Sequence, residues 1–287
     1  MTMPSDPTMP LAENTSTPSS RNLWLRIASA AVLAPLAIGS AYLGGWLFTI
    51  FWLIAAAAVW WEWVGLVDSV ERHVLIATGF CALLLQAILV ELGYDVTAMM
   101  VIALGVLAAV VTAGRGAPWI AAGIVYASAL LIAPVILRAD PEFGLLAILF
   151  LFAVVWSTDI GGYFAGRAFG GPKLAPAISP KKTWSGAIGG TLAAIAAAVA
   201  ISVYFAPGNH LPMAVIALVL SVASQAGDLF ESWLKRRVGA KDSSRLIPGH
   251  GGVMDRLDGF IFAAAIAALF GVIRGGLEGP AAALFVW

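Results

Sequence analysis

Long runs of apolar residues separated by short polar breaks dominate this sequence. A helix that spans a membrane needs about 20 residues that are mostly apolar. The breaks carry Gly, Pro or charge, as at Gly44-Gly45 and between Arg138 and Glu142. The pattern therefore predicts an all-α, polytopic transmembrane helical bundle. We expect about nine spans, at about 24–43, 46–67, 74–91, 96–113, 117–137, 143–165, 185–205, 211–230 and 258–274.

The composition agrees with a membrane protein. Of the 287 residues, 61% are hydrophobic and 11% are charged, whereas a soluble protein carries roughly 25% charged residues. The net charge of zero argues against a nucleic-acid binder, and a single cysteine excludes a disulfide framework. Residues 1–22 contain much Pro, Ser and Thr, which predicts a disordered tail. Residues 23–287 are expected to form a single integral-membrane domain.

The Lys and Arg residues predict the orientation of the spans. Cytoplasmic loops are enriched in Lys and Arg. If the N-terminus is cytoplasmic and the spans alternate, only Arg138 and Arg274 of the 16 Lys and Arg residues fall on the outside. Two long polar loops, about 166–184 and 231–257, then lie on the cytoplasmic side. Within the domain we expect front spans at 23–154, a catalytic portion at 155–260, and a last span with a tail at 261–287.

The second polar loop belongs to the most highly charged stretch of the chain, Gly227 to Gly259. On a continuous helix, Asp228, Ser232 and Lys235 stand at i, i+4 and i+7 and share one face. A carboxylate, a hydroxyl and an ammonium group in this order suit Mg²⁺, metal-bound water and a phosphate. The alternative is a helix end whose charged groups are simply solvated.

A glycine-rich turn follows in LIPGHGGVMDRLDG, where glycine lets backbone N–H groups approach phosphate oxygens. His250 stands inside this turn and is a candidate phosphate donor. Asp255 and Asp258 follow at i, i+3. Mg²⁺ favours one or two carboxylates together with substrate phosphates, and Asp228 and Asp255 fit that pattern if the two helix ends are adjacent.

The first polar loop adds Asp159, close to glycines that indicate tight packing or close approach of a ligand. Lys181 and Lys182 in SPKKTW precede a new helix and are candidates for binding a triphosphate. Ser179 or Thr183 is expected to cap that helix, whose N-terminus favours anions. The alternative is that the two lysines only mark the cytoplasmic side.

Glu62 in VWWEW (59–63) is an unusual acidic residue inside a predicted span. An ionised carboxylate there costs roughly 2.5–3.5 kcal/mol on insertion. Its ordinary interpretation is a carboxyl group near the membrane surface, or one that shares a proton with a neighbour. Because the chain lacks a nucleophile elbow, a Walker A motif, HExxH and a CxxC pair, the charged groups predict metal-assisted phosphoryl-type transfer rather than acyl transfer.

The run from Ser232 to Asp258, S-W-L-K-R-x(4)-K-D-x(6)-G-H-G-G-x-M-D-R-L-D, resembles the motif of the phosphatidate cytidylyltransferases of bacteria (CDP-diacylglycerol synthases). SQAGDLFES, TDIGGYFAGRAFG and SPKKTW also resemble that family, so the close match covers about 155–260. The family commonly has Glu after SPKKTW, where this chain has Ser185, and this puts in doubt the role of a carboxylate there.

The resemblance implies a cell inner membrane enzyme that makes CDP-diacylglycerol and pyrophosphate from CTP and phosphatidic acid, on the cytosolic side. It also implies dependence on Mg²⁺, allows a second, monovalent cation, and suggests a homodimer among membrane lipids with no nucleic-acid partner. Two rivals stay open: a CTP-dependent kinase of a lipid alcohol, and a transporter coupled to cations or protons. The implied catalytic residues are Asp159, Asp228, Ser232, Lys235, Asp255, Arg256 and Asp258, the phosphate-binding residues Lys181, Lys182, Arg236, Lys241, His250, Gly251 and Gly252, and the metal ligands Asp228 and Asp255.

Overall fold

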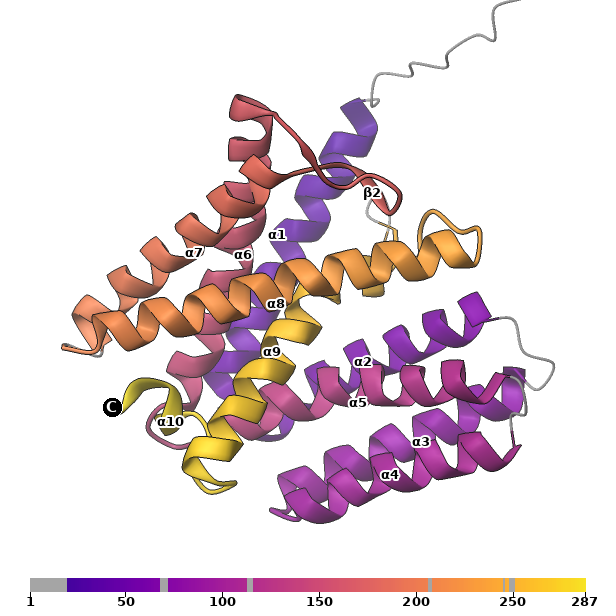
Figure 1. Cartoon of the computed structure of the whole chain (residues 1–287). Helices are drawn as coiled ribbons and strands as arrows, with labels where there is room; N and C mark the ends of the chain where they lie inside the picture. The colour runs from indigo at the N-terminus through magenta and orange to yellow at the C-terminus, as the bar shows by residue number, and fades with distance from the viewer. Residues whose placement is uncertain (1–19, 68–71, 113–115, 206–207, 245, 248–250) are drawn as a thin grey trace, which may run out of the picture.

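The computed structural model describes residues 20–287 with four short gaps and residue 245 left out: 68–71, 113–115, 206–207 and 248–250. The predicted tail, residues 1–22, therefore lies mostly outside the described residues, and His250 lies wholly outside them. The described chain is a helical bundle with one short hairpin (Figure 1). Its elements are α1 (Ser20–Leu43), α2 (Gly45–Val67), α3 (Arg72–Glu91), α4 (Asp95–Thr112), α5 (Ala117–Arg138), α6 (Gly144–Phe169), β1 (Lys173–Ala175), β2 (Ser179–Thr183), α7 (Trp184–Phe205), α8 (His210–Arg237), α9 (Met254–Gly275) and α10 (Ala282–Phe285).

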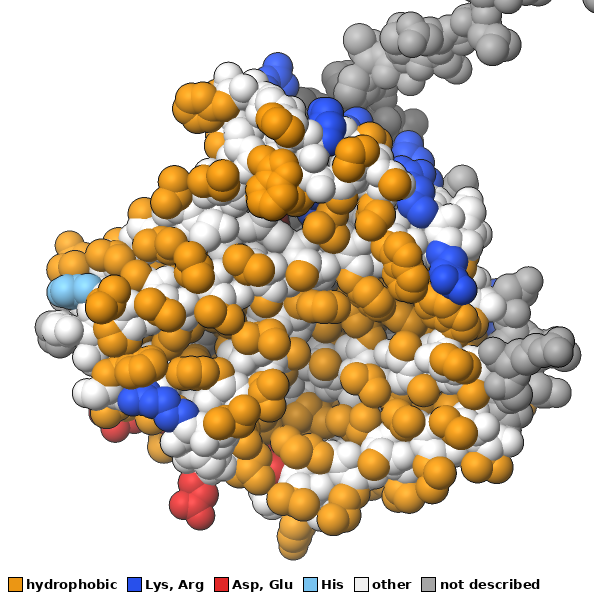
Figure 2. All heavy atoms as spheres, viewed as in Figure 1, with side chains coloured by type: hydrophobic (Ala, Val, Ile, Leu, Met, Phe, Trp, Pro, Cys, Tyr) orange, Lys and Arg blue, Asp and Glu red, His pale blue; other side chains and the backbone are white. Residues whose placement is uncertain are grey.

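Each of the nine predicted apolar segments is a helix, which confirms the all-α class. Seven helices in the described residues are long and apolar enough to cross a membrane, namely α2, α3 and α5 to α9. The described part of α1 and the helix α4 contain shorter apolar stretches, Ala31–Leu43 and Asp95–Val111. Figure 2 shows a face covered largely by hydrophobic side chains, with most of the visible Lys and Arg near the hairpin and the end of α8.

The two polar loops are shorter than predicted, because helices extend into them. Helix α6 continues to Phe169 and α8 continues to Arg237. The basic last turn of α8 explains its extension, since cations are favourable near a helix C-terminus. The remaining first loop contains the antiparallel β1–β2 hairpin, which the sequence pattern did not predict.

Small residues let the helices of the second half approach closely. A Cβ added to Gly161 would lie 2.5 Å from the Cβ of Ala193, and one added to Gly190 would lie 2.5 Å from the carbonyl oxygen of Thr158. The glycines of the TDIGGYFAG segment therefore pack α6 against α7, as close helix contacts in membranes require. Of the two proposed caps for α7, the structure confirms Thr183, whose hydroxyl accepts the Gly186 N–H at 3.1 Å.

Candidate active site

The site forms where the end of α8, the start of α9 and strand β2 meet. Helices α8 and α9 cross at two glycines: a Cβ on Gly227 would lie 2.4 Å from the Asp258 carbonyl oxygen, and one on Gly259 would lie 2.5 Å from Ser224 Oγ. Each glycine is next in sequence to an acid, Asp228 or Asp258. The close helix crossing thus brings the two acidic segments together, which is the condition on which the predicted pairing of Asp228 and Asp255 depends.

The side chains of Asp228, Ser232 and Lys235 come from one continuous helix, which is the condition under which the three share a face. Ser232 Oγ donates to Asp228 Oδ1 at 3.4 Å. The other Asp228 oxygen forms an ion pair with Lys182 of β2. A lysine of the first polar loop and an acid of the second therefore meet in space, although 46 positions separate them in sequence.

Lys235 bridges two acids instead of pointing into an open phosphate site. Its ammonium group lies 2.7 Å from Glu231 Oε2 and 2.5 Å from Asp255 Oδ1. Glu231 is 2% exposed, and its second oxygen has no hydrogen-bond partner among the described residues. Sequence reasoning missed Glu231, although its i, i+4 spacing to Lys235 is the signal that predicts such a pair.

The Asp255 carboxylate accepts hydrogen bonds from the turn before α9. Its Oδ2 accepts the N–H of Gly252 at 2.8 Å, and the N–H and hydroxyl of Ser243 at 3.0 and 2.9 Å. Gly251 has φ +85°, which only glycine adopts readily. The turn is thus shaped around a carboxylate, and the Gly252 N–H is directed at Asp255, not at a separate phosphate.

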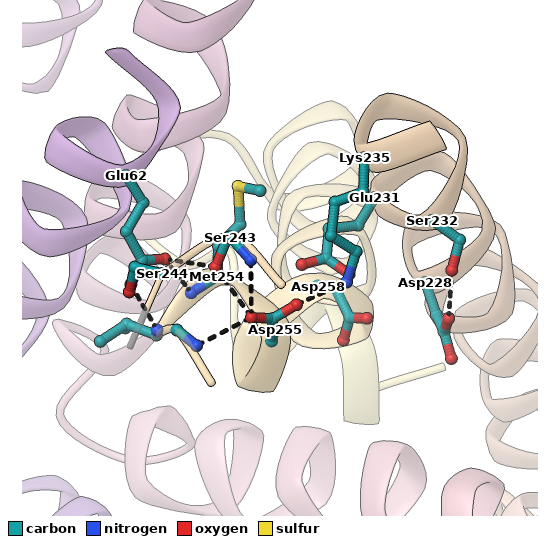
Figure 3. Close-up of polar contacts among 12 residues, drawn as sticks. Glu62, Asp228, Glu231, Ser232, Lys235, Ser243, Ser244, Met254, Asp255 and Asp258 are labelled. Carbon is teal, nitrogen blue, oxygen red and sulfur yellow. Dashed lines mark hydrogen bonds and ion pairs between the residues drawn. The ribbon is translucent and has the colours of Figure 1, made fainter. Parts of the chain in front are cut away.

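Asp258 lies between these two groups of contacts (Figure 3). Its Oδ1 accepts the N–H of Gly259 at 2.7 Å. The carboxylates of Asp228 and Asp159 are close enough to interact with it electrostatically. The acids of α6, α8 and α9 therefore form one concentrated region of negative charge at the edge of the bundle.

The other predicted residues surround this region. Lys181, Arg236, Lys241 and Arg256 are exposed, and Ser185 contacts Thr183 and donates to the Gly170 carbonyl group. Ser185, which stands where the family commonly has Glu, therefore joins the start of α7 to the end of α6 through its hydroxyl.

Glu62 is the second acid whose place the sequence did not reveal. It is 1% exposed on α2 and accepts hydrogen bonds from the α8–α9 connection, about 180 residues further along the chain. No spacing in the sequence indicates such a partner. The site is thus built from both halves of the molecule.

The described residues contain no group of three or more His, Cys, Asp or Glu side chains arranged to hold a metal ion. An apolar cavity of about 510 Å³ lies between α4, α5, α8 and α9. Phe230, next to Glu231, lines it, and so does Tyr126, whose buried hydroxyl has no hydrogen-bond partner among the described residues. A charged region and an apolar cavity are therefore neighbours.

Comparisons with known proteins place this architecture in a family. The model of the cytidylyltransferase family matches residues 24–273. A phosphatidate cytidylyltransferase of Brucella suis is 44% identical over 274 residues, which is 92% of this chain and 98% of the relative. One of Brucella abortus is 45% identical over 262 residues (88% and 94%), and one of Haemophilus influenzae is 47% identical over 137 residues (46% and 47%). With the family model matching most of its length, this chain belongs to the cytidylyltransferase family.

Proposed function

We propose that this protein is a phosphatidate cytidylyltransferase of a bacterial inner membrane. The lipid phosphate oxygen attacks the α-phosphorus of CTP, the bond from that phosphorus to the bridging oxygen breaks, and pyrophosphate leaves. The observation that carries the proposal is the meeting of Lys182, Asp228, Lys235 and Asp255 at one end of a membrane bundle in a member of this family. CDP-diacylglycerol is the lipid product.

The chemistry of the acids fits a magnesium ion held jointly by protein and substrate. Asp228 and Asp255 offer carboxylate oxygens from adjacent helices, and the described residues form no complete protein cage. Mg²⁺ commonly binds one or two carboxylates and completes its coordination with phosphates and water. Bound there, it would neutralise charge on the triphosphate. A second, monovalent cation stays a prediction.

The basic residues hold the reactants in position. Lys182 is fixed by the carboxylate of Asp228, so its ammonium group loses little freedom when it binds phosphate oxygens, whereas Lys235 holds Asp255 in place. The exposed Lys181, Arg236 and Arg256 surround them and supply further positive charge. These residues bind and orient the anionic groups of the two substrates.

The membrane setting matches the two substrates. Phosphatidate keeps its acyl chains in lipid. The cavity beside Phe230 is lined by apolar side chains, which suit an acyl chain. Its phosphate reaches the charged region, to which CTP has access from the cytosol. We expect the active protein to be a homodimer, which light scattering of the purified protein measures.

Transfer of label from CTP tests the function. Purified protein is given Mg²⁺, either phosphatidate or a polyprenol-type lipid alcohol, and CTP labelled at either the α- or the γ-phosphorus. Label from the α position in lipid supports cytidylyl transfer. Label only from the γ position, with a lipid alcohol as acceptor, establishes the rival kinase. A proteoliposome flux that survives both Asp228→Asn and Asp255→Asn establishes the rival transporter.

A further inference from the structure

The buried carboxylate of Glu62 faces four hydrogen-bond donors from the α8–α9 connection and the start of α9 (Figure 3). Its Oε1 accepts the Ser244 hydroxyl at 2.6 Å and the Val253 N–H at 2.8 Å. Its Oε2 accepts the Ser243 hydroxyl at 2.9 Å and the Met254 N–H at 2.8 Å. A carboxylate inside a membrane protein is costly unless it is fully hydrogen-bonded, and these donors satisfy that condition.

These contacts cap helix α9 from another part of the molecule. The N-cap residue is Val253, whose side chain has no acceptor, whereas Ser, Thr, Asp or Asn usually occupies this position. Glu62 instead accepts the N–H groups of Val253 and Met254, two of the amides at the start of α9 that have no partner within the helix. Its negative charge also lies at the positive end of the α9 dipole, where anions are favourable. The start of α9 therefore depends on α2.

One hydroxyl joins this cap to the proposed catalytic acid. Ser243 Oγ lies 2.9 Å from Glu62 Oε2 and 2.9 Å from Asp255 Oδ2, so the two carboxylates share its single proton. The Gly252 N–H, next to the amides that Glu62 binds, donates to the same Asp255 oxygen. The two carboxylates thus hold the same short piece of chain from opposite sides.

The identity of residue 252 follows from this arrangement. A Cβ on Gly252 would lie 1.9 Å from Ser243 Oγ, and 2.6 and 2.7 Å from the two Glu62 carboxylate oxygens. Helix α2 is also held against α9 by the stacked rings of Trp52 and Phe260, whose centroids are 4.7 Å apart. The chain therefore leaves room for a carboxylate at this point and fixes the helix that carries it.

We propose that Glu62 is a positioning residue for Asp255. Its carboxylate fixes Ser243 and the amides of residues 252–254, and these set the direction of the Asp255 side chain toward Lys235. The role of Asp255 in turnover rests on the proposed function, whereas the capping of α9 by Glu62 does not. A residue of the front half thereby controls the catalytic portion.

Glu62→Gln tests this proposal with two measurements. An amide keeps the size of the side chain but directs an NH₂ group at two of the four donors. Hydrogen exchange in a peptide spanning residues 251–257 should become about tenfold faster or more. The turnover number kcat should fall about tenfold to a hundredfold, as for groups that orient catalytic ligands, while KM for CTP changes less than about threefold. Faster exchange with unchanged kcat would make Glu62 purely structural and overturn the proposal, and so would unchanged exchange.

Ser243→Ala and Ser244→Ala are a matched pair that decides the question if Glu62→Gln does not fold. Both serines donate to Glu62, but only Ser243 also donates to Asp255. The proposal predicts a clearly larger fall in kcat for Ser243→Ala than for Ser244→Ala. Equal kcat values for the two variants would contradict it.

A double-mutant cycle tests the contact itself. Gly252→Ala should speed exchange in peptide 251–257 strongly in the wild-type background and much less in a background of Glu62→Ala with Ser243→Ala, which together remove all three close contacts of the new Cβ. Additive effects would overturn the proposal. Because exchange is measured without substrate, the cycle gives its answer even if the proposed reaction proves wrong.

Discussion

The acidic residues of this site together carry more negative charge than the neighbouring lysines balance. Asp228 pairs with Lys182, and Lys235 serves both Glu231 and Asp255. Asp258 stands among these acids, and its Oδ1 accepts the N–H of the following residue. Like charges repel more strongly where water is scarce, so the cluster lowers stability while it attracts cations.

Asp258→Asn should therefore separate stability from activity. The change removes a charge, keeps the size of the side chain, and retains an oxygen for the Gly259 N–H. We expect the free energy of unfolding to rise by about 0.5–2 kcal/mol, as for other changes that relieve a functional site, and turnover to fall. Denaturation in detergent and the CTP assay measure the two effects.

The control is Glu142→Gln, which changes an exposed acid between α5 and α6, away from the site. It should alter neither quantity. Full turnover by Asp258→Asn with an unchanged free energy of unfolding would show that Asp258 contributes neither to the repulsion among the acids nor to turnover.

At the scale of elements, the position of the site depends on close helix contacts. Helices α6 and α7 meet through glycines, and α8 and α9 meet at Gly227 and Gly259. The polar side chains of Thr158, Ser221 and Thr191 hydrogen-bond across α6, α7 and α8. Because the acids stand next to these contacts in sequence, a wider helix spacing would separate them.

Gly190→Ala tests this dependence. The new Cβ would lie 2.5 Å from the Thr158 carbonyl oxygen, which belongs to the backbone and moves only with its helix. We expect a loss of about 1–3 kcal/mol in the free energy of unfolding, typical of overpacking, together with reduced turnover. Gly39→Ala in α1 is the matched control, since nothing lies within 4 Å of its Cβ. Equal stability of the two variants would contradict the close contact.

The helices could be predicted from sequence because hydrophobic runs of this length have few other structures available in a membrane. Their ends could not, as the charged last turn of α8 shows, because charge alone does not end a helix. The β1–β2 hairpin has strands of three and five residues, too short for a period-two pattern to show. Asp228, Ser232 and Lys235 were found through local spacing, whereas the partners of Glu62 depend on tertiary structure alone.

At the scale of the whole molecule, the exposed basic residues lie mostly near one end of the bundle (Figure 2). Among them are Lys173 in the hairpin and Arg236 at the end of α8. The distribution of Lys and Arg favours a cytoplasmic position for that end. The proposed reaction requires the same orientation, because CTP is supplied from the cytosol.

Cysteine labelling measures the orientation. In a Cys81→Ala background, which removes the one cysteine, Lys173→Cys and Glu142→Cys place single thiols at opposite predicted faces. A maleimide that does not cross membranes should label position 142 in intact spheroplasts and position 173 only after permeabilisation. The reverse pattern would place the site outside the cytoplasm.

The most direct test of the account is a magnesium titration of cytidylyl transfer by the purified protein and by Asp255→Asn. The account predicts that α-label from CTP enters phosphatidate-derived lipid only when Mg²⁺ is present. It predicts that Asp255→Asn, still inserted and folded, turns over about 10²–10³-fold more slowly, as when a preorganised electrostatic group is lost. Full activity in EDTA, or near-normal turnover by Asp255→Asn, would contradict it.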